Sequence, residues 1–256
     1  MKHKFCLLAC GLLISLSPTL SGNDRHLKAY LVVWNVGQGQ WATWSDATTC
    51  FHFDMGGEKK SLRQVKSLCG FKENKIYLSH WDWDHLSFLE KAKRVLPNSC
   101  IALAPEGPGS SHKERLLQNY QNCSSPEPKK ISIQELTAGL PEEHGKKSSN
   151  DLSHVLLVQR KFLIPGDSTI KEEKRWDRFP TLPLTKWLLL GHHGSRTSTS
   201  EDLLNKIPQL KVAISSARFA KYGHPHGEVI ARLHHHHIPL LRTEDWGNIW
   251  FEVNEN

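Results

Sequence analysis

The sequence predicts an α/β fold, on the evidence of its length, its recurring apolar runs and the alternation of two kinds of segment. The chain has 256 residues, of which 38% are hydrophobic, which suits one domain with a sizeable core. Runs rich in Val, Ile, Leu and aromatic residues predict strands at residues 30–34, 75–79, 155–158, 162–164, 187–190, 212–215 and 249–251. Helix-like stretches lie at residues 61–67, 86–95, 113–120, 200–206 and 228–234. This alternation is typical of an α/β fold in which hairpins join the early strands and helices join the later ones.

Residues 104–150 differ in composition from the rest of the chain. Pro, Gly, Ser, Lys and Glu dominate there, as in the run from Pro105 to Gly109. Such a segment has too little apolar surface to build a core of its own. We therefore expect a surface insertion carrying one helix within a single domain at residues 27–254, rather than a second domain.

The N-terminal residues predict export. Lys2 and Lys4 precede an apolar stretch at residues 5–16 that is short for a bilayer span, and small polar residues follow it. This is the pattern of a signal peptide over residues 1–21, which leaves no stable membrane span in a periplasmic or secreted protein. An uncleaved anchor is one alternative. Lipid attachment at Cys10 is another, although the apolar run continues past that cysteine.

Four cysteines remain after the leader, namely Cys50, Cys69, Cys100 and Cys123. An even number of cysteines in an exported chain predicts two disulfides. The sequence leaves all three possible pairings open.

The strongest chemical signal is a cluster of potential metal ligands that directly follows one predicted strand. Four such residues fall within six positions, namely His80, Asp82, Asp84 and His85. Strand ends in α/β proteins project their side chains into the crevice where sites are built. Imidazole and carboxylate groups together suit Zn, Mn or Fe. Grouping so many polar groups without a cation would be costly, so the segment predicts a metal site.

Two later segments repeat the pattern of an apolar strand that ends in a potential ligand. The strand at residues 162–164 leads to Asp167, and the strand at residues 187–190 leads to His192 and His193. Each segment alone is modest evidence. Together with the first cluster they suit two divalent metals, which need about six ligands including a bridging carboxylate.

These motifs resemble the metallo-β-lactamase superfamily, and more narrowly the C-terminal domain of the competence protein ComEC, which writes its first motif His-x-Asp-x-Asp-His. The resemblance implies an αβ/βα sandwich of two mixed sheets with outer helices. It covers nearly the whole chain after the leader. Further segments that carry it are Val36-Gly37-Gln38-Gly39, Asp54-Met55-Gly56-Gly57, Asn150 to Leu157, Gly166-Asp167, Gly191-His192-His193-Gly194-Ser195, Tyr222-Gly223-His224-Pro225-His226, and Arg242-Thr243 with Gly247.

The resemblance also implies a role for each matching residue. His80 and Asp82 would hold one divalent metal, Zn or Mn, and Asp167 would bridge to a second. The second metal would be held by Asp84, His85 and His192. His193 and His226 would support the ligands or contact a substrate phosphate, so that the residues expected to act in catalysis are Asp84, His193 and His226.

Two departures from the family pattern bear on the first metal. The family's Asp-Val-Gly-Gln-Gly-Asp is replaced here by a segment that begins with Asn35 and ends with Gln40, so both acids are lost. The superfamily's lone middle histidine has no equivalent, and Asn150 or Ser149 stands near its place. We therefore expect the first metal to bind more weakly than the second.

The implied activity is metal-assisted hydrolysis of phosphodiesters, with DNA as the expected partner. The formal charge of +7, which becomes +5 without the two lysines of the leader, favours an anionic partner. One alternative is a hydrolase of lactams, lactones or thioesters. Another is a non-catalytic DNA-binding component of an uptake apparatus, which the acids lost at positions 35 and 40 favour.

Two other features of the sequence contain residues that could form a site. The run of four histidines at residues 234–237 suits an exposed helix end, because adjacent side chains of a helix cannot all face one ion. Trp81 and Trp83 alternate with the ligands of the first motif, so in an extended segment they would point away from the metals and into packing. A stacking platform for bases is the alternative for these two residues.

Overall fold

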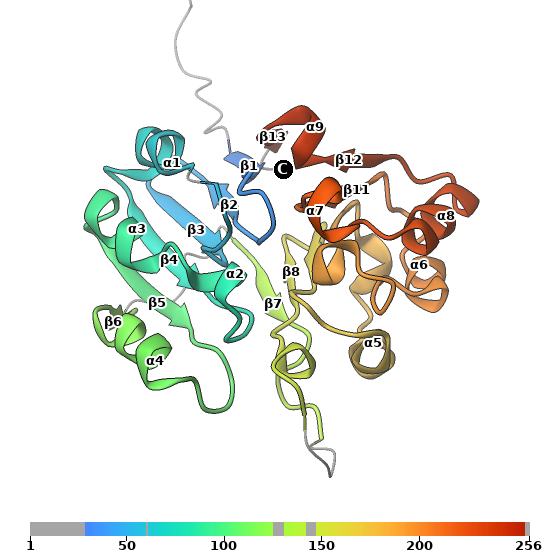
Figure 1. The fold of residues 1–256 in the computed structure, drawn as a ribbon, viewed down its shortest axis with the longest axis horizontal. Helices are drawn as coiled ribbons and strands as arrows, with labels where there is room; N and C mark the ends of the chain where they lie inside the picture. Colours follow the sequence, from blue (N-terminus) through green and yellow to red (C-terminus); the bar gives the residue numbers. More distant parts are fainter. Residues whose placement is uncertain (1–28, 60, 125–130, 142–146, 254–256) are drawn as a thin grey trace, which may run out of the picture.

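The computed structural model describes residues 29–59, 61–124, 131–141 and 147–253, so the predicted signal peptide at residues 1–21 lies outside them. The chain forms two mixed β-sheets that pack face to face, with helices on both outer sides (Figure 1). The predicted fold class is therefore confirmed. Within the described residues, no helix is both long enough and apolar enough to cross a membrane.

The first sheet has seven strands in the order β13-β1-β2-β3-β4-β5-β6. Antiparallel pairing runs from β13 to β3, and the remaining pairs are parallel. The strands are β1 (Ala29–Val33), β2 (Ala42–Ser45), β3 (Thr49–Phe53), β4 (Glu73–Tyr77), β5 (Ser99–Leu103), β6 (Gln121–Asn122) and β13 (Ile249–Val253). The two ends of the described chain thus meet side by side as β1 and β13.

The second sheet has six strands in the order β12-β11-β10-β9-β8-β7. Its strands β9 to β12 are parallel, and β7 and β8 join them antiparallel. The strands are β7 (Ile133–Glu135), β8 (Leu156–Val158), β9 (Phe162–Ile164), β10 (Trp187–Leu189), β11 (Val212–Ser215) and β12 (Leu240–Arg242).

Helices cover the outer face of each sheet. In Figure 1 the first sheet carries α1, α3 and α4, and the second carries α5, α6 and α8. The α-helices are α1 (Leu62–Cys69), α2 (Trp83–Leu86), α3 (Leu89–Val95), α4 (Ser111–Gln118), α5 (Ile170–Trp176), α6 (Glu201–Lys206), α7 (Phe219–Tyr222), α8 (Gly227–His235) and α9 (Thr243–Trp246). Short 3₁₀ helices are η1 (Asn150–Leu152), η2 (Leu182–Leu184) and η3 (Gly191–Gly194).

The core has three apolar layers because successive side chains of a strand point to opposite faces. In β1, Leu31 and Val33 lie in the layer between the sheets, whereas Val32 packs in the layer beneath the outer helices. In β9, Leu163 belongs to the third layer, together with Trp176 of α5. Fully burying one Leu, Val or Ile side chain contributes about 1.5–3 kcal/mol. Packing in these layers holds both sheets in position. It thereby also positions the strand ends at which the polar motifs lie.

All seven predicted strand regions contain strands, but the sequence-based prediction omitted β2, β3, β5 and β12. The helix predicted at residues 86–95 is two short helices, α2 and α3. Residues 104–150 contain α4, close to the predicted helix at residues 113–120. They also supply β6 and β7, which form an edge of the first sheet and an edge of the second. Edge strands this short carry little hydrophobic pattern, which is why composition did not indicate them.

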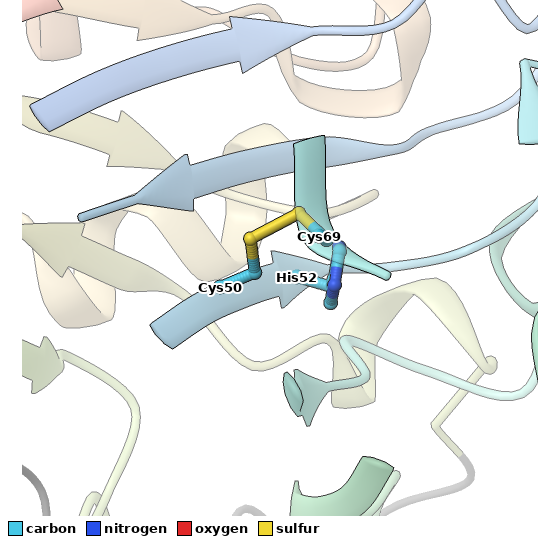
Figure 2. Close-up of side chains that lie close together, drawn as sticks. All are labelled: Cys50, His52 and Cys69. Atoms are coloured by element: carbon cyan, nitrogen blue, oxygen red, sulfur yellow. A yellow bond between two sulfur atoms is a disulfide. The ribbon is translucent and has the colours of Figure 1, made fainter. Parts of the chain in front are cut away.

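The four remaining cysteines form two disulfides, Cys50–Cys69 and Cys100–Cys123. The first ties β3 to the last residue of α1, and Figure 2 shows it beside His52 on the same strand. The second ties β5 to the residue that follows β6. The two disulfides of the predicted count are therefore present, and the structure selects one of the three pairings.

Candidate metal centre

The potential ligands converge because strands from both sheets end at one edge of the sandwich. In the first sheet, β4 ends shortly before His80. In the second sheet, β9 leads to Asp167, and β10 leads into η3 with His192 and His193. A Cβ atom added to Gly166 would lie 2.7 Å from the Cβ of Ser79, so glycine at this position lets the two edges meet.

One set of side chains, here called the Asp84 group, comprises Asp84, His85 and His193 around Oδ1 of Asp167. Nε2 of His85 lies 3.0 Å from Asp167 Oδ1 and 3.3 Å from Nε2 of His193. Nε2 of His193 lies 3.0 Å from Asp84 Oδ2 and 3.7 Å from Asp167 Oδ1. Two imidazoles and two carboxylates thus face one point.

A second set, here called the His80 group, comprises His80, Asp82 and His192 around Oδ2 of Asp167. Nε2 of His80 lies 3.6 Å from Asp82 Oδ2 and 3.7 Å from Asp167 Oδ2. Nε2 of His192 lies 3.6 Å from the same Asp167 oxygen. Asp167 therefore presents one oxygen to each group, which is the arrangement expected of a bridging carboxylate.

In the structure, the adjacent histidines His192 and His193 have the opposite roles from those expected from the sequence. The family resemblance implies that His192 lies with Asp84 and that His193 has a supporting role, whereas in the structure His193 contacts Asp84 and His192 faces the His80 group. Both residues have positive φ, 47° and 58°, which is uncommon for residues other than glycine. This tight left-handed turn separates the ring centroids of the two histidines by 6.3 Å. Strained backbone of this kind is often found at functional sites.

The hydrogen bonds of the three buried histidines direct their Nε2 lone pairs inward. The Ser79 hydroxyl donates its one hydrogen to Asp54 Oδ2 at 2.8 Å, so it accepts from Nδ1 of His80 at 2.9 Å. Nδ1 of His85 donates to the same Asp54 oxygen at 2.7 Å, and Nδ1 of His193 donates to a backbone carbonyl after β11 at 3.1 Å. A neutral imidazole has one N–H, so in the neutral rings that bind a metal each Nε2 is left as the ligand atom.

Asp54, which follows β3, is the residue that holds this orientation. It is 1% exposed and has a φ of 55°. Its Oδ1 accepts from the backbone N–H of Ser79 at 2.7 Å, and its Oδ2 accepts from the side-chain amide of Gln40 at 2.7 Å. Together with the bonds from the Ser79 hydroxyl and from His85, these contacts fix the carboxylate beneath both ligand groups.

The residues present fit divalent metals. Nε2 of His80 and Oδ1 of Asp167 are buried without a hydrogen-bond partner, although acceptor atoms surround both. Buried polar atoms without partners are costly, and several acceptors that face one another without a hydrogen between them are satisfied by a cation. The mixture of imidazole nitrogens and carboxylate oxygens suits Zn or Mn.

The electrostatics of the cluster also favour a positive charge at its centre. Burial alone would lower the pKa of His85, but Asp167 and Asp54 on either side raise it well above its ordinary value. Burial opposes the ionisation of Asp167, yet His85 and His193 hold its pKa well below the ordinary range. In the same way burial would raise the pKa of Asp84, but the neighbouring His193 and His85 lower it. Ionised carboxylates therefore face the imidazoles.

Two glycine-containing loops hold the backbone of Asp84 and His85. The residue that follows Gly39 donates its N–H to the Asp84 carbonyl at 3.0 Å, and the residue before Gly56 donates to the His85 carbonyl at 2.7 Å. A Cβ added at Gly39 or Gly56 would lie 2.6 Å or 2.3 Å from the Asp84 carbonyl oxygen. This close approach explains why glycine stands at both positions of the two motifs.

The other two histidines of the motifs, His224 and His226, make different contacts. His226, which was expected to act in catalysis, is the N-cap of α8, and its Nδ1 accepts from the backbone N–H of Glu228 at 3.3 Å. His224 instead stacks on the ring of His192, with the centroids 6.3 Å apart and the planes 22° apart. The structure therefore places His224 against a ligand of the His80 group, a position the sequence argument did not assign.

Other contacts were also missed or differ from expectation. Asn150 lies beside His192, with its Nδ2 3.5 Å from Nε2 of that ring. Gln40 binds Asp54 beneath the Asp84 group rather than a ligand of the first metal, so the weaker first metal remains a prediction. The available signal for Asp54 was its place directly after an apolar run and before Gly56 and Gly57.

In two further groups of potential ligands, the sulfur atoms or the imidazole nitrogens are already engaged. Near His52 the sulfur atoms of Cys50 and Cys69 are bonded to each other (Figure 2). His154 uses both ring nitrogens, at 2.5 Å from Glu135 and at 2.9 Å from a backbone carbonyl. The candidate metal centre at Asp167 is thus the better supported cluster among the described residues.

No family model matches the chain, but three curated proteins are similar to it. It is 29% identical over 218 residues to the ComE operon protein 3 of Bacillus subtilis, an alignment covering 78% of this chain and 27% of that protein. It is 30% identical over 186 residues to Recombination protein 2 of Haemophilus influenzae, covering 70% and 22%. It is 27% identical over 232 residues to the Competence protein ComA of Neisseria gonorrhoeae, covering 88% and 32%. The matches thus span about a quarter to a third of these relatives.

Two solved structures share the fold. The metallo-β-lactamase fold protein YhfI from Bacillus subtilis has a TM-score of 0.54 and 10% identity, covering 88% of this chain and 100% of that one. A diphosphatase from the PhnP family has a TM-score of 0.52 and 13% identity, covering 89% and 99%. The resemblance seen in the motifs is confirmed: the chain has the metallo-β-lactamase fold and is similar in sequence to a segment of competence proteins, consistent with a ComEC-like domain.

Proposed function

We propose that this protein is an exported, metal-dependent hydrolase that cleaves phosphodiester bonds, with DNA as its substrate. The observation that carries the proposal is the position of Asp167. Each of its oxygens faces a separate group of imidazole and carboxylate ligands, and the Nδ1 hydrogen bonds of His80, His85 and His193 leave the inward Nε2 atoms of the neutral rings to a metal. This is the donor arrangement that two adjacent divalent metals require.

The chain's own residues would divide the work as follows. The Asp84 group and the His80 group would each hold one divalent metal, and Asp167 would touch both. Bound metals of this kind polarise a phosphoryl oxygen and lower the pKa of water. Asp54 fixes the ring orientation of His85, and through Ser79 that of His80. His224, whose ring stacks on that of His192, would donate a hydrogen bond to a substrate phosphate.

The choice of DNA rests on the relatives and on charge. One of the three relatives is named a competence protein and another a recombination protein, and the formal charge, which is +5 without the two lysines of the leader, favours a polyanion. Export is supported by the two disulfides, since disulfides persist in oxidising compartments.

The test combines metal content with turnover. The protein lacking residues 1–21 is purified, its metal is measured, and it is incubated with Mn²⁺ or Zn²⁺ and labelled single-stranded and duplex DNA. We expect cleavage that EDTA abolishes, and a loss of at least about 100-fold in rate for Asp84→Asn. Asp202→Asn, an exposed carboxylate on α6, is the matched control and should leave the rate unchanged.

The same experiment separates the alternative functions. Cleavage of nitrocefin or a thioester without cleavage of DNA would replace the phosphodiester assignment with an acyl hydrolase. A folded protein that binds DNA but takes up no metal and cleaves nothing would contradict the enzyme assignment altogether. It would support a DNA-binding component instead.

A further inference from the structure

The candidate metal centre is partly open to solvent. The side chains of Asp82, Asp84 and His192 are 41%, 36% and 29% exposed, whereas His80 and Asp167 are buried. A substrate phosphate therefore has to approach from the side of the first three residues. The flanking surface on that side contacts the rest of the substrate.

The backbone of Trp83 borders this opening. It stands between Asp82 and Asp84 in sequence, so its Cα is about 3.8 Å from the Cα of each. The sequence argument expected both tryptophans of the motif to pack inward. Trp81 is half-buried against the core, but Trp83 is 47% exposed. An indole ring that stays half in solvent beside a site contributes little to the core and is available to a ligand.

The ring of Trp83 is supported on one side by α4. It lies against the ring of His112, with the centroids 5.6 Å apart and the planes tilted by 34°. The start of α4 is itself tied to the ligand loop, because Lys113 donates to the backbone carbonyl of Trp81. In addition, Nε1 of Trp81 donates to the Gly107 carbonyl at 2.9 Å. The Trp83 ring is therefore held in place, and holding an aromatic surface in advance reduces the entropy cost of stacking.

We propose that Trp83 is a base-stacking residue, whose indole ring receives the nucleobase next to the phosphodiester held at the metal centre. This rests on the proposed function. Every base has a π-face, so stacking on an aromatic side chain tolerates any sequence. Within a duplex the faces of a base are covered by its neighbours, so the subsite selects unpaired nucleotides. Trp83 would thereby make single-stranded DNA, or a frayed end, the preferred substrate.

The test uses Trp83→Ala, Trp83→Phe and the control Trp246→Ala, which removes a tryptophan that is 70% exposed on α9. For single-stranded DNA we expect Trp83→Ala to raise KM about tenfold, within the range of one base–aromatic stack, with kcat within about twofold. Without metal, the Kd measured by fluorescence anisotropy should rise by a similar factor. Trp83→Phe should restore most of the affinity, and Trp246→Ala should match the wild type.

A strand with one abasic nucleotide at the cleaved position separates stacking from an indirect effect on the ligands. On that strand the wild type and Trp83→Ala should have equal KM values, and the metal content and melting temperature of Trp83→Ala should equal those of the wild type. An equal loss on normal and abasic strands, or normal DNA binding by Trp83→Ala, would overturn the stacking role while leaving DNA hydrolysis intact. A wild type that neither binds nor cleaves DNA would instead remove the proposed function itself.

Discussion

The buried histidine on β3 makes the stability of the first sheet depend on pH. His52 is fully buried, and its Nδ1 accepts from Trp41 Nε1 at 3.2 Å and lies 2.9 Å from the Thr43 hydroxyl. Because Nδ1 accepts from the Trp41 indole, it carries no hydrogen, so the Thr43 hydroxyl, which accepts from the indole N–H of Trp34 at 2.8 Å, donates its own hydrogen to His52. Nε2 of His52 in turn donates to Asn74 Oδ1 at 2.9 Å. This network accommodates the neutral ring alone, because a second N–H would face two donors.

The magnitude follows from the pKa of His52. Burial lowers this pKa from 6.5 to about 4, although the hydrogen bond to Asn74 opposes the shift. Above pH 6.5 the ring is neutral in both folded and unfolded chains, and its contribution to stability is fully present. As the pH falls from 6.5 to about 4, the unfolded chain binds a proton that the folded chain does not, so stability is lost. At about 1.4 kcal/mol per unit, the loss is about 3 kcal/mol.

The assay is urea unfolding of the wild type and of His52→Gln at pH 7.5 and pH 4, each with EDTA to exclude metal linkage. A glutamine amide offers one acceptor and donors like the neutral imidazole but does not titrate in this range. All other titrating groups are common to both proteins, so their contributions cancel in the comparison. We expect the wild type to lose about 3 kcal/mol more than His52→Gln. Equal losses in the two proteins would refute the reasoning.

Three further predictions concern the residues around the ligands. Gln40→Leu removes the hydrogen bond to Asp54 and should raise the metal Kd about tenfold. Isothermal titration calorimetry measures this Kd. An unchanged Kd would show that Asp54 keeps its orientation without the hydrogen bond from Gln40. Gly56→Ala places a Cβ 2.3 Å from the Asp84 carbonyl oxygen and should lower both metal content and melting temperature, whereas wild-type values would contradict the close approach. Glu58→Gln weakens the bonds that tie α7 to the first half of the chain and should speed amide hydrogen exchange in α7, without changing exchange in α5.

Much of the fold could be predicted from local patterns. The strands β9, β10 and β11 are almost wholly buried, so their apolar runs are continuous and easily recognised. Segments of only a few residues, such as β6, β7 and β12, carry no such pattern and are strands because a neighbouring strand accepts their hydrogen bonds. The break between α2 and α3 likewise escaped prediction, because the apolar spacing continues across it.

The candidate site likewise contains some residues that the sequence indicates and others that it does not. Ligand types at strand ends indicate His80, Asp84 and Asp167 because each follows a strand whose direction the sequence reveals. The residues that hold those ligands in place cannot be predicted from sequence spacing. Asp54, for example, bonds to His85, which lies 31 positions later in the chain. The exchange of roles between adjacent histidines also depends on a left-handed turn that only packing at the sheet edge imposes.

The sequence by itself determined the class of fold, the even number of cysteines and the kinds of side chain at each strand end, since these depend on composition and spacing. Only the tertiary structure decided which cysteines pair, which histidine joins Asp84, and which tryptophan of the ligand loop stays exposed. The physical reason is that these outcomes depend on distances between atoms far apart in the chain. Those distances are fixed when the two sheets bury their facing side chains and bring their edges together.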